Sequence, residues 1–286
     1  MNLINTRWPP FKPASHYQWL FYDTPTPTTV VCAEHRENIV GLFALHERQL
    51  QSGELCGTAG ALVIEDDYRG MGLFKALGDE ACALSPHLDV LCSVANPYGG
   101  NALAKNFGYQ DFGAVVTMTR PVAADDPSEG VSLEKVSSST VFDGDIALPP
   151  GTTGFTASAA YQGWRYGSGN RYAFYKSTGQ DTSYIILKLF PKNDDETMVG
   201  DIMGIFARDW DPRRIVELIR STVAASARLG VREVYAWAGP EDPYAPLLAE
   251  AGFTPREQPE RRLCVLPLEN KTLLGPWHVT MSDSMR

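Results

Sequence analysis

The 286-residue sequence has no long apolar run: no uncharged apolar stretch approaches the roughly 20 residues that a membrane-spanning helix needs. Its first residues contain neither a basic segment nor an apolar core, so we expect no export signal and a cytoplasmic protein. Basic residues are scarce, with 25 Lys and Arg against 34 Asp and Glu and a formal net charge of −9. A nucleic-acid-binding surface concentrates basic charge to neutralise phosphates. We therefore expect neither a membrane nor a nucleic acid among the partners.

Cysteine and histidine are also few. The five cysteines show no CxxC spacing, and none of the five histidines pairs with another at metal-ligand spacing. Four of the cysteines lie in apolar stretches, such as residues 30–33 and 90–92. We expect buried free thiols in a reducing compartment and no bound metal.

What the sequence does contain is two stretches of strand and helix patterns separated by a polar segment. Residues 121–130 are rich in Pro, Asp and Gly, and similar composition recurs at 137–140 and 148–151. Because domains commonly hold about 100–200 residues, the chain is long enough for two. We predict a first domain over 1–124, a linker over 125–150 and a second domain over 151–286.

Hydrophobic periodicity predicts an α/β protein with a mixed sheet. Strands are predicted at residues 28–34, 39–46, 58–64, 90–94, 112–118, 172–175, 183–189, 198–206 and 231–237. Helices are predicted at residues 73–84, 101–107, 212–229 and 244–251. The two halves share the order strand, long helix, strand, short helix, and then a glycine with an aromatic residue, Gly108-Tyr109 and Gly252-Phe253. This order is a weak internal repeat.

The most informative stretch, residues 66–77, follows a predicted strand and opens a predicted helix. Gly70 and Gly72 would let the backbone approach a bulky anion, and the first turn of a helix offers unpaired N–H groups at the positive end of its dipole. A diphosphate would then lie over residues 70–75, with Arg69 adding charge. A tight turn without a ligand is the alternative. The spacing fits neither the dinucleotide GxGxxG nor the P-loop pattern.

Residues 68–74, Tyr-Arg-Gly-Met-Gly-Leu-Phe, resemble the acyl-CoA pyrophosphate loop of the GNAT N-acyltransferases, whose pattern is Arg/Gln-x-x-Gly-x-Gly/Ala. Arg69 and Gly72 match this pattern, while Phe74 replaces its final Gly or Ala. The resemblance implies that acetyl-CoA or a longer acyl-CoA is the cosubstrate, with pantetheine pairing like an added strand. It implies cofactor contacts at Leu62, Val63, Arg69, Gly70, Met71, Gly72, Leu73, Phe74, Lys75 and Asn96.

Three further segments resemble the tandem branch of this superfamily, some of whose members acylate nucleotide-linked amino sugars. They are Asn96, twelve residues before Gly108, then residues 161–166 and residues 277–284. The resemblance implies two tandem GNAT-like domains, the second degenerate because no glycine loop lies between Phe206 and the helix predicted at 212.

The second of these segments supplies our candidates for the acceptor site: Trp164, Arg165 and Tyr166. Arg165 would hold a phosphate or carboxylate, and an aromatic ring would stack on a base or sugar. The alternative is that Trp164 and Tyr166 are core residues and Arg165 pairs with an acid.

In GNAT enzymes an amine usually attacks the thioester directly, so the enzyme must deprotonate the amine and protonate the thiolate. Glu65 is the candidate base and Tyr98 the candidate acid, with residues 66–67 as alternative bases. Two departures from the superfamily stand out: Ala104 where many members place a tyrosine acid, and Ala61 where tandem members often place an acid.

Three functions therefore stay open. The first is transfer of an acyl group to the primary amine of a small acceptor, for example a nucleotide-linked amino sugar. The second is binding of acyl-CoA without catalysis. The third is acylation of a peptide, antibiotic or protein amine.

Overall fold

The computed structural model describes residues 3–4, 12–123, 131–137, 146–167, 171–178, 183–192, 197–257, 261–268 and 275–283. The chain forms two compact units. Unit 1 comprises Met1–Phe112, Arg262–Leu273 and Ser284–Arg286, and unit 2 comprises Gly113–Arg261 and Leu274–Asp283.

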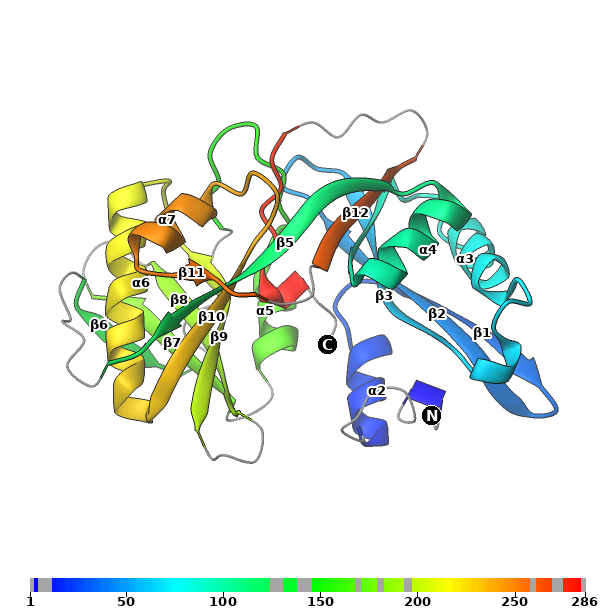
Figure 1. Ribbon diagram of the computed structural model, residues 1–286, viewed down its shortest axis with the longest axis horizontal. Helices are drawn as coiled ribbons and strands as arrows, with labels where there is room; N and C mark the ends of the chain where they lie inside the picture. Colours follow the sequence, from blue (N-terminus) through cyan, green and yellow to red (C-terminus); the bar gives the residue numbers. More distant parts are fainter. Residues whose placement is uncertain are drawn as a thin grey trace. The chain divides into compact units, whose positions relative to one another are not determined.

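Unit 1 is a mixed sheet with helices on both faces (Figure 1). Its elements are α2 (Ala14–Phe21), β1 (Thr28–His35), β2 (Asn38–Gln49), β3 (Leu55–Ile64), η1 (Asp66–Tyr68), α3 (Leu73–Ala83), β4 (Val90–Ala95), α4 (Pro97–Phe107) and β12 (Arg261–Pro267). The strand order is β1-β2-β3-β4-β12, and among these described strands only the pair β3–β4 is parallel. Alternate residues of β2 face opposite sides: Phe43 and Leu45 pack with α3 and α4, whereas Leu42 and Ala44 pack with α2.

Unit 2 has a second mixed sheet, again with helices on both faces. Its elements are β6 (Leu133–Val136), α5 (Ala159–Tyr166), β7 (Tyr172–Ser177), β8 (Tyr184–Pro191), β9 (Met198–Phe206), α6 (Pro212–Ser226), η3 (Ala227–Leu229), β10 (Val231–Ala238), α7 (Tyr244–Glu250), β11 (Thr254–Pro255) and η4 (Met281–Asp283). The order is β6-β7-β8-β9-β10, with β5 (Gln110–Pro121) beside β10, and β9–β10 is the parallel pair.

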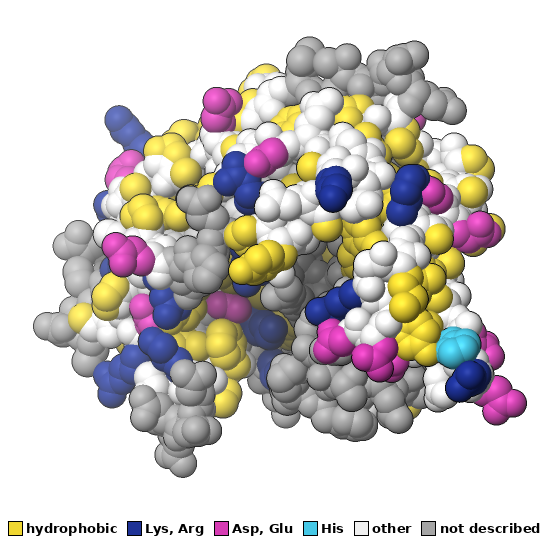
Figure 2. All heavy atoms as spheres, turned by 45° about the vertical axis from the view of Figure 1, so that its right-hand side comes forward, with side chains coloured by type: hydrophobic (Ala, Val, Ile, Leu, Met, Phe, Trp, Pro, Cys, Tyr) yellow, Lys and Arg dark blue, Asp and Glu magenta, His cyan; other side chains and the backbone are white. Residues whose placement is uncertain are grey.

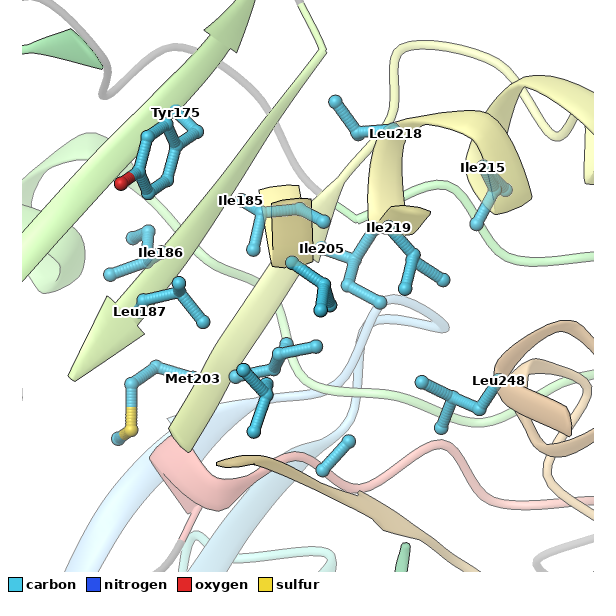
Figure 3. Close-up of a cluster of buried hydrophobic side chains, with 14 of the residues drawn as sticks. Tyr175, Ile185, Ile186, Leu187, Met203, Ile205, Ile215, Leu218, Ile219 and Leu248 are labelled. Atoms are coloured by element: carbon cyan, nitrogen blue, oxygen red, sulfur yellow. The ribbon is translucent and has the colours of Figure 1, made fainter. Parts of the chain in front are cut away.

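The core of unit 2 lies between its sheet and α6. Figure 3 shows Ile185 of β8 and Ile205 of β9 meeting Ile219 of α6. Side chains alternate along β8, so Tyr184 points to the other face, where its hydroxyl donates to Gln162 Oε1 of α5 at 2.7 Å. Helices α5 and α6 therefore cover opposite faces of the sheet.

Each unit contains a strand that the sequence order would assign to the other half. β5 follows α4 along the chain but pairs with β10, with Thr117 opposite Trp237. β12 comes after the elements of unit 2 but pairs with β4, with Val265 opposite Cys92. The last strand of each sheet is thus exchanged between the two halves of the sequence.

The predicted mixed α/β fold is confirmed, and every predicted strand and helix is present. Helix α4 begins at Pro97 instead of the predicted residue 101, because Asn96 caps it. The segment predicted as a linker contains β6, and α2, α5 and β12 were not predicted. The expectation of buried thiols holds for Cys56, Cys92 and Cys264 and is wrong for Cys32, which lies exposed on edge strand β1.

In the part of the chain that the structure describes, we find no helix long and apolar enough to cross a membrane.

Candidate functional site

The parallel strands β3 and β4 of unit 1 part from each other. Within the described residues their ladder runs only from Cys56 to Thr58 on β3 and from Val90 to Cys92 on β4. Beyond it, Ser93 Oγ donates to the Ala59 carbonyl at 3.3 Å. The backbone of the remaining residues of β3, which include Leu62 and Val63, is therefore not laddered to β4. An extended ligand arm could pair with such an edge.

A β-bulge reshapes β3 at the same place. The register places Leu45 opposite Ala59 but Phe43 opposite Leu62, so β3 holds one residue more than β2 in this interval. Bulges bend a strand and redirect its backbone groups, and they occur often beside active sites.

The loop after β3 has a backbone that favours glycine. Gly70 and Gly72 lie in the left-handed region, with φ of +77° and +81°. A Cβ added at either position would meet no atom within 4 Å. Glycine is therefore favoured at both positions by the left-handed backbone and not by crowding from neighbouring atoms, and the space beside the loop is open. Met71 between them is 68% exposed.

Helix α3 begins with backbone amides that its own hydrogen bonds leave unused. Its N-cap is Gly72, which supplies no capping side chain, and the first turn holds no acidic residue. The first amide bonded within the helix is that of Ala76, which donates to the Gly72 carbonyl at 3.1 Å. The amides of Leu73, Phe74 and Lys75 thus point from the positive end of the helix dipole, an arrangement suited to a phosphate.

Two cations flank this loop. Arg69 Nη1 lies 2.8 Å from Asp66 Oδ1, and both side chains are more than half exposed. Lys75 Nζ lies 2.6 Å from Asp79 Oδ2. Exposed ion pairs contribute little to stability, so both cations could turn to a bound diphosphate at small cost. Figure 2 shows acidic and basic side chains interspersed over the face that it draws.

Phe74 anchors the start of α3. Its ring packs against Phe107 of α4 with centroids 5.1 Å apart. The side chain that departs from the GNAT pattern that the loop resembles thus packs α3 against α4.

Asn96 and Tyr98 lie at the start of α4. Asn96 Oδ1 accepts a hydrogen bond from the Gly99 amide at 2.8 Å and so caps the helix. Tyr98 stands in the first turn with its side chain 88% exposed. Asn96 therefore has a structural role in addition to the cofactor contact predicted for it.

Two substitutions separate these roles of Asn96. We expect Asn96→Ala to lower the free energy of unfolding by about 1 kcal/mol through loss of the cap. Asn96→Asp keeps an oxygen at the cap, so it should unfold like the parent chain in urea. If Asn96 also contacts acyl-CoA, the new charge of Asn96→Asp will weaken acetyl-CoA binding in a titration. Unchanged affinity in both variants leaves only the cap.

Glu65 directly follows β3 and lines a polar hollow of about 460 Å³. Its amide donates to the Val40 carbonyl at 2.9 Å, and its side chain is half-buried. The hollow is lined by Leu3, Glu65, Tyr68 and residues 35–40. Among the lining residues, the Tyr68 hydroxyl and His35 Nδ1 are 2.5 Å apart. Solvent therefore reaches Glu65 from this side.

The three predicted acceptor residues lie on α5 of unit 2. Tyr166 is 1% exposed, and its ring meets that of Tyr172 edge-on with centroids 5.3 Å apart. Arg165 is 4% exposed, whereas Trp164 is half-buried beside Tyr161. The helix thus carries both core and partly accessible residues of this segment.

The long helix of unit 2, α6, begins differently from α3. Its N-cap Asp211 accepts hydrogen bonds from the amides of Arg213 and Arg214 at 3.1 and 3.3 Å. Asp209 lies beside it in a small hollow. A carboxylate therefore already occupies the position where α3 offers free amides.

One candidate functional residue, Asp201, was not predicted from the sequence. Strand β9 consists of apolar residues and glycines except for Asp201, which is its single carboxylate. The signal that could have identified it is this isolated charge in a run with the pattern of a buried strand.

Among the described residues, no group of three or more His, Cys, Asp or Glu side chains is placed to hold a metal.

Solved structures with a similar fold include two that are described as GCN5-related N-acetyltransferases. The protein from Anabaena variabilis shares 16% identity, with a TM-score of 0.64 over 92% of this chain and 68% of its own. The protein from Kribbella flavida shares 12% identity, with a TM-score of 0.63 over 94% of this chain and 67% of its own. No protein-family model and no curated protein matches the sequence. The fold is thus that of these acetyltransferases.

Proposed function

We propose that this chain is an N-acyltransferase that moves an acyl group from acetyl-CoA or a longer acyl-CoA to a primary amine. The observation that carries the proposal is the combination in unit 1 of a bulged β3, its separation from β4, and a glycine loop opening onto the free amides of α3. The similarity of fold to GCN5-related N-acetyltransferases supports it.

In this proposal the diphosphate of the acyl-CoA is bound by the loop. The amides from Gly70 to Lys75 would donate to its oxygens, with Arg69 and Lys75 adding charge. The pantetheine arm would run along β3 beside Leu62 and Val63 and pair with its backbone as an additional strand. Met71 and Asn96 complete the contacts that we propose for the cofactor.

The chemistry that we propose is direct attack of the amine on the thioester. The new C–N bond forms as the C–S bond breaks, the ammonium proton passes to a base, and the thiolate takes up a proton. Glu65 is the proposed base, acting through water from the hollow beside it, and Tyr98 is the proposed donor to the thiolate. Holding both reactants in one geometry supplies much of the rate.

We further propose that unit 2 is a second, degenerate copy of the fold. Its support is the matching pattern of the two sheets: a parallel pair follows antiparallel strands in each, and β3 and β9 each carry a bulge next to that pair. The capped α6 favours loss of acyl-CoA binding there. Trp164, Arg165 and Tyr166 would help shape an acceptor site, with a nucleotide-linked amino sugar as one acceptor class. A cytoplasmic location belongs to the same proposal.

A second candidate function is binding of acyl-CoA without turnover. The observation in its favour is that the two positions where relatives often place an acid hold alanine: Ala61 is buried in an apolar cluster, and Ala104 is exposed on α4.

The test is release of free CoA thiol from acetyl-CoA in the presence of a panel of primary amines, with N-acetylated forms as controls. We expect amine-dependent thiol release at a rate well above that of hydrolysis, and a rate that falls in Glu65→Gln. Saturable acetyl-CoA binding without release with any amine would favour the second function. Absence of acetyl-CoA binding would contradict both.

A further inference from the structure

Unit 2 contains a half-buried carboxylate without a partner. Asp201 of β9 lies opposite Lys188 of β8 and opposite Tyr235 of β10 in the register of the sheet. In the described parts of the chain, its carboxylate makes no hydrogen bond or ion pair. A partly desolvated charge without a partner costs free energy, so its presence calls for a reason.

Glu233, a carboxylate on the same sheet, differs from Asp201 because it accepts several hydrogen bonds. Glu233 of β10 accepts hydrogen bonds from Lys192 Nζ at 2.9 Å and Thr119 Oγ1 at 2.8 Å. The Tyr235 hydroxyl donates to the same group. Burial acts to raise the pKa of Glu233, yet these hydrogen bonds hold it at about 2. Asp201 has no such donors, although it pairs across the sheet with Tyr235.

Asp201 stands where the two parallel strands part. The ladder between β9 and β10 ends at the pair Asp201–Tyr235, and β9 has a bulge at Met203, just after Ile202. In unit 1 the ladder of β3 and β4 ends in the same way at Thr58, just before the bulge. Asp201 thus lies at the ladder end of the second sheet as Thr58 does in the first, with a carboxylate where Thr58 has a hydroxyl.

The face on which Asp201 lies is that of α5. Lys188 and Tyr172 are register partners, as are Lys188 and Asp201, so all three side chains share one face. Lys188 lies an even number of residues from Tyr184 on β8, so both side chains face the side of the sheet on which Tyr184 contacts α5. Burial raises the pKa of the Tyr172 hydroxyl. The charge of Arg165 on α5 acts to lower this pKa, and the charge of Asp201 acts to raise it.

The charged groups around Asp201 leave its carboxylate open to a cation. Burial raises the pKa of the Asp201 carboxyl to about 6, against the opposing influence of Lys188 and Arg261. Neither cation pairs with it: Lys188 Nζ lies over the Phe190 ring at 5.9 Å, and the Arg261 guanidinium lies over the Trp237 ring at 4.9 Å. At neutral pH the group is largely ionised and gains from a cation that reaches it.

We propose that Asp201 binds the primary ammonium group of a small monoamine where β9 and β10 part, with Tyr235 opposite it on β10 and Tyr172 on the same face of the sheet. Lys188 and Arg261 repel further positive charge, so the ligand carries neutral or anionic groups besides its ammonium. That this amine is the acceptor of the acyl group rests on the proposed function. The binding itself does not.

The experiment is a titration of the full chain, without any CoA compound, by ligand-observed NMR. The probes are ethanolamine, phosphoethanolamine and glucosamine, each with its N-acetylated form, and spermidine. We expect at least one monoamine to bind at neutral pH, with no binding of its N-acetylated form. Asp201→Asn should weaken binding by at least about tenfold, whereas Glu217→Gln, an exposed carboxylate on α6, should leave it unchanged.

Three results would overturn the inference: equal binding to Asp201→Asn, tighter binding of spermidine, or no binding of any monoamine. Asp201→Asn removes no hydrogen bond, so its melting temperature should equal or exceed that of the parent. If the variant does not fold, the pH dependence of amine binding to the parent chain is the test. Binding needs the ionised carboxylate of Asp201, so the affinity should be lost as pH falls through about 6. An affinity that stays constant over this range contradicts the role of Asp201. Amine binding tests this inference, and acetyl-CoA binding tests the proposed function, so their failures are distinct.

Discussion

Replacement of Gly72 by glutamate is expected to abolish acetyl-CoA binding while the chain still folds. Gly72 has φ +81° and caps α3, so a side chain there stands at the free amides of the helix. The glutamate carboxylate would compete for these amides and repel a diphosphate. Like charges brought together cost several kcal/mol, which corresponds to a loss of at least about 100-fold in affinity. Calorimetric titration of acetyl-CoA measures it.

A matched control separates this effect from backbone strain. Gly53→Glu makes the same change in charge at another glycine of unit 1 with positive φ, +106°, and a Cβ there also meets no atom within 4 Å. Gly53 lies in the turn before β3, at the opposite end of that strand from the glycine loop. Both variants should lose about 1–2 kcal/mol of stability, because a left-handed backbone strains any residue with a Cβ. Only Gly72→Glu should lose the ligand, and undiminished binding in that variant would remove the loop from the site.

Truncation of Leu263 to alanine is expected to destabilise unit 1, although this residue follows nearly all of unit 2 in the sequence. Leu263 is fully buried and pairs with Val94 of β4. Removing a buried leucine side chain from a packed core costs about 2–5 kcal/mol. Amide hydrogen exchange should report the loss as faster exchange in β3 and β4.

Leu248→Ala is the companion variant. Leu248 is also almost fully buried, 1% exposed, but it belongs to the core of unit 2. It should lose a similar amount of stability with faster exchange in β8 and β9 instead. If Leu263→Ala loosened β8 and β9 while sparing β4, the exchange of strands between the two halves would be wrong.

Most elements could be predicted because their signals are local. α6 begins at Pro212 after its N-cap Asp211, and the η3 turn that follows it ends before Gly230. α3 has apolar residues at helical spacing after Gly72. The glycine loop could be recognised for the same reason, because a left-handed backbone at residues 70 and 72 demands glycine wherever the rest of the chain lies.

The features that were missed depend on partners distant in the sequence. β12 has a short apolar run, and nothing within it indicates that Cys92 lies opposite Val265. β6 is an edge strand whose inner residues are exposed, so it lacks the alternation that identifies a strand. Cys32 has apolar neighbours, but it lies on an edge strand that leaves it open to solvent.

The candidate site shows the same division. Gly70, Gly72 and Arg69 could be identified from their spacing, whereas Asp201 owes its character to what surrounds it. Its lack of hydrogen-bond donors and its place where β9 and β10 part become evident only once the register of β8, β9 and β10 is known.

The most direct test of acyl-CoA binding by unit 1 is amide hydrogen exchange of the full chain with and without saturating acetyl-CoA. Backbone amides that bind a diphosphate or pair with pantetheine exchange more slowly. We predict slower exchange in peptides covering residues 59–64 and 69–76, with little change at residues 207–215 before and within the first turn of α6. Protection at 207–215 in place of 69–76, or no protection in either, would contradict the account.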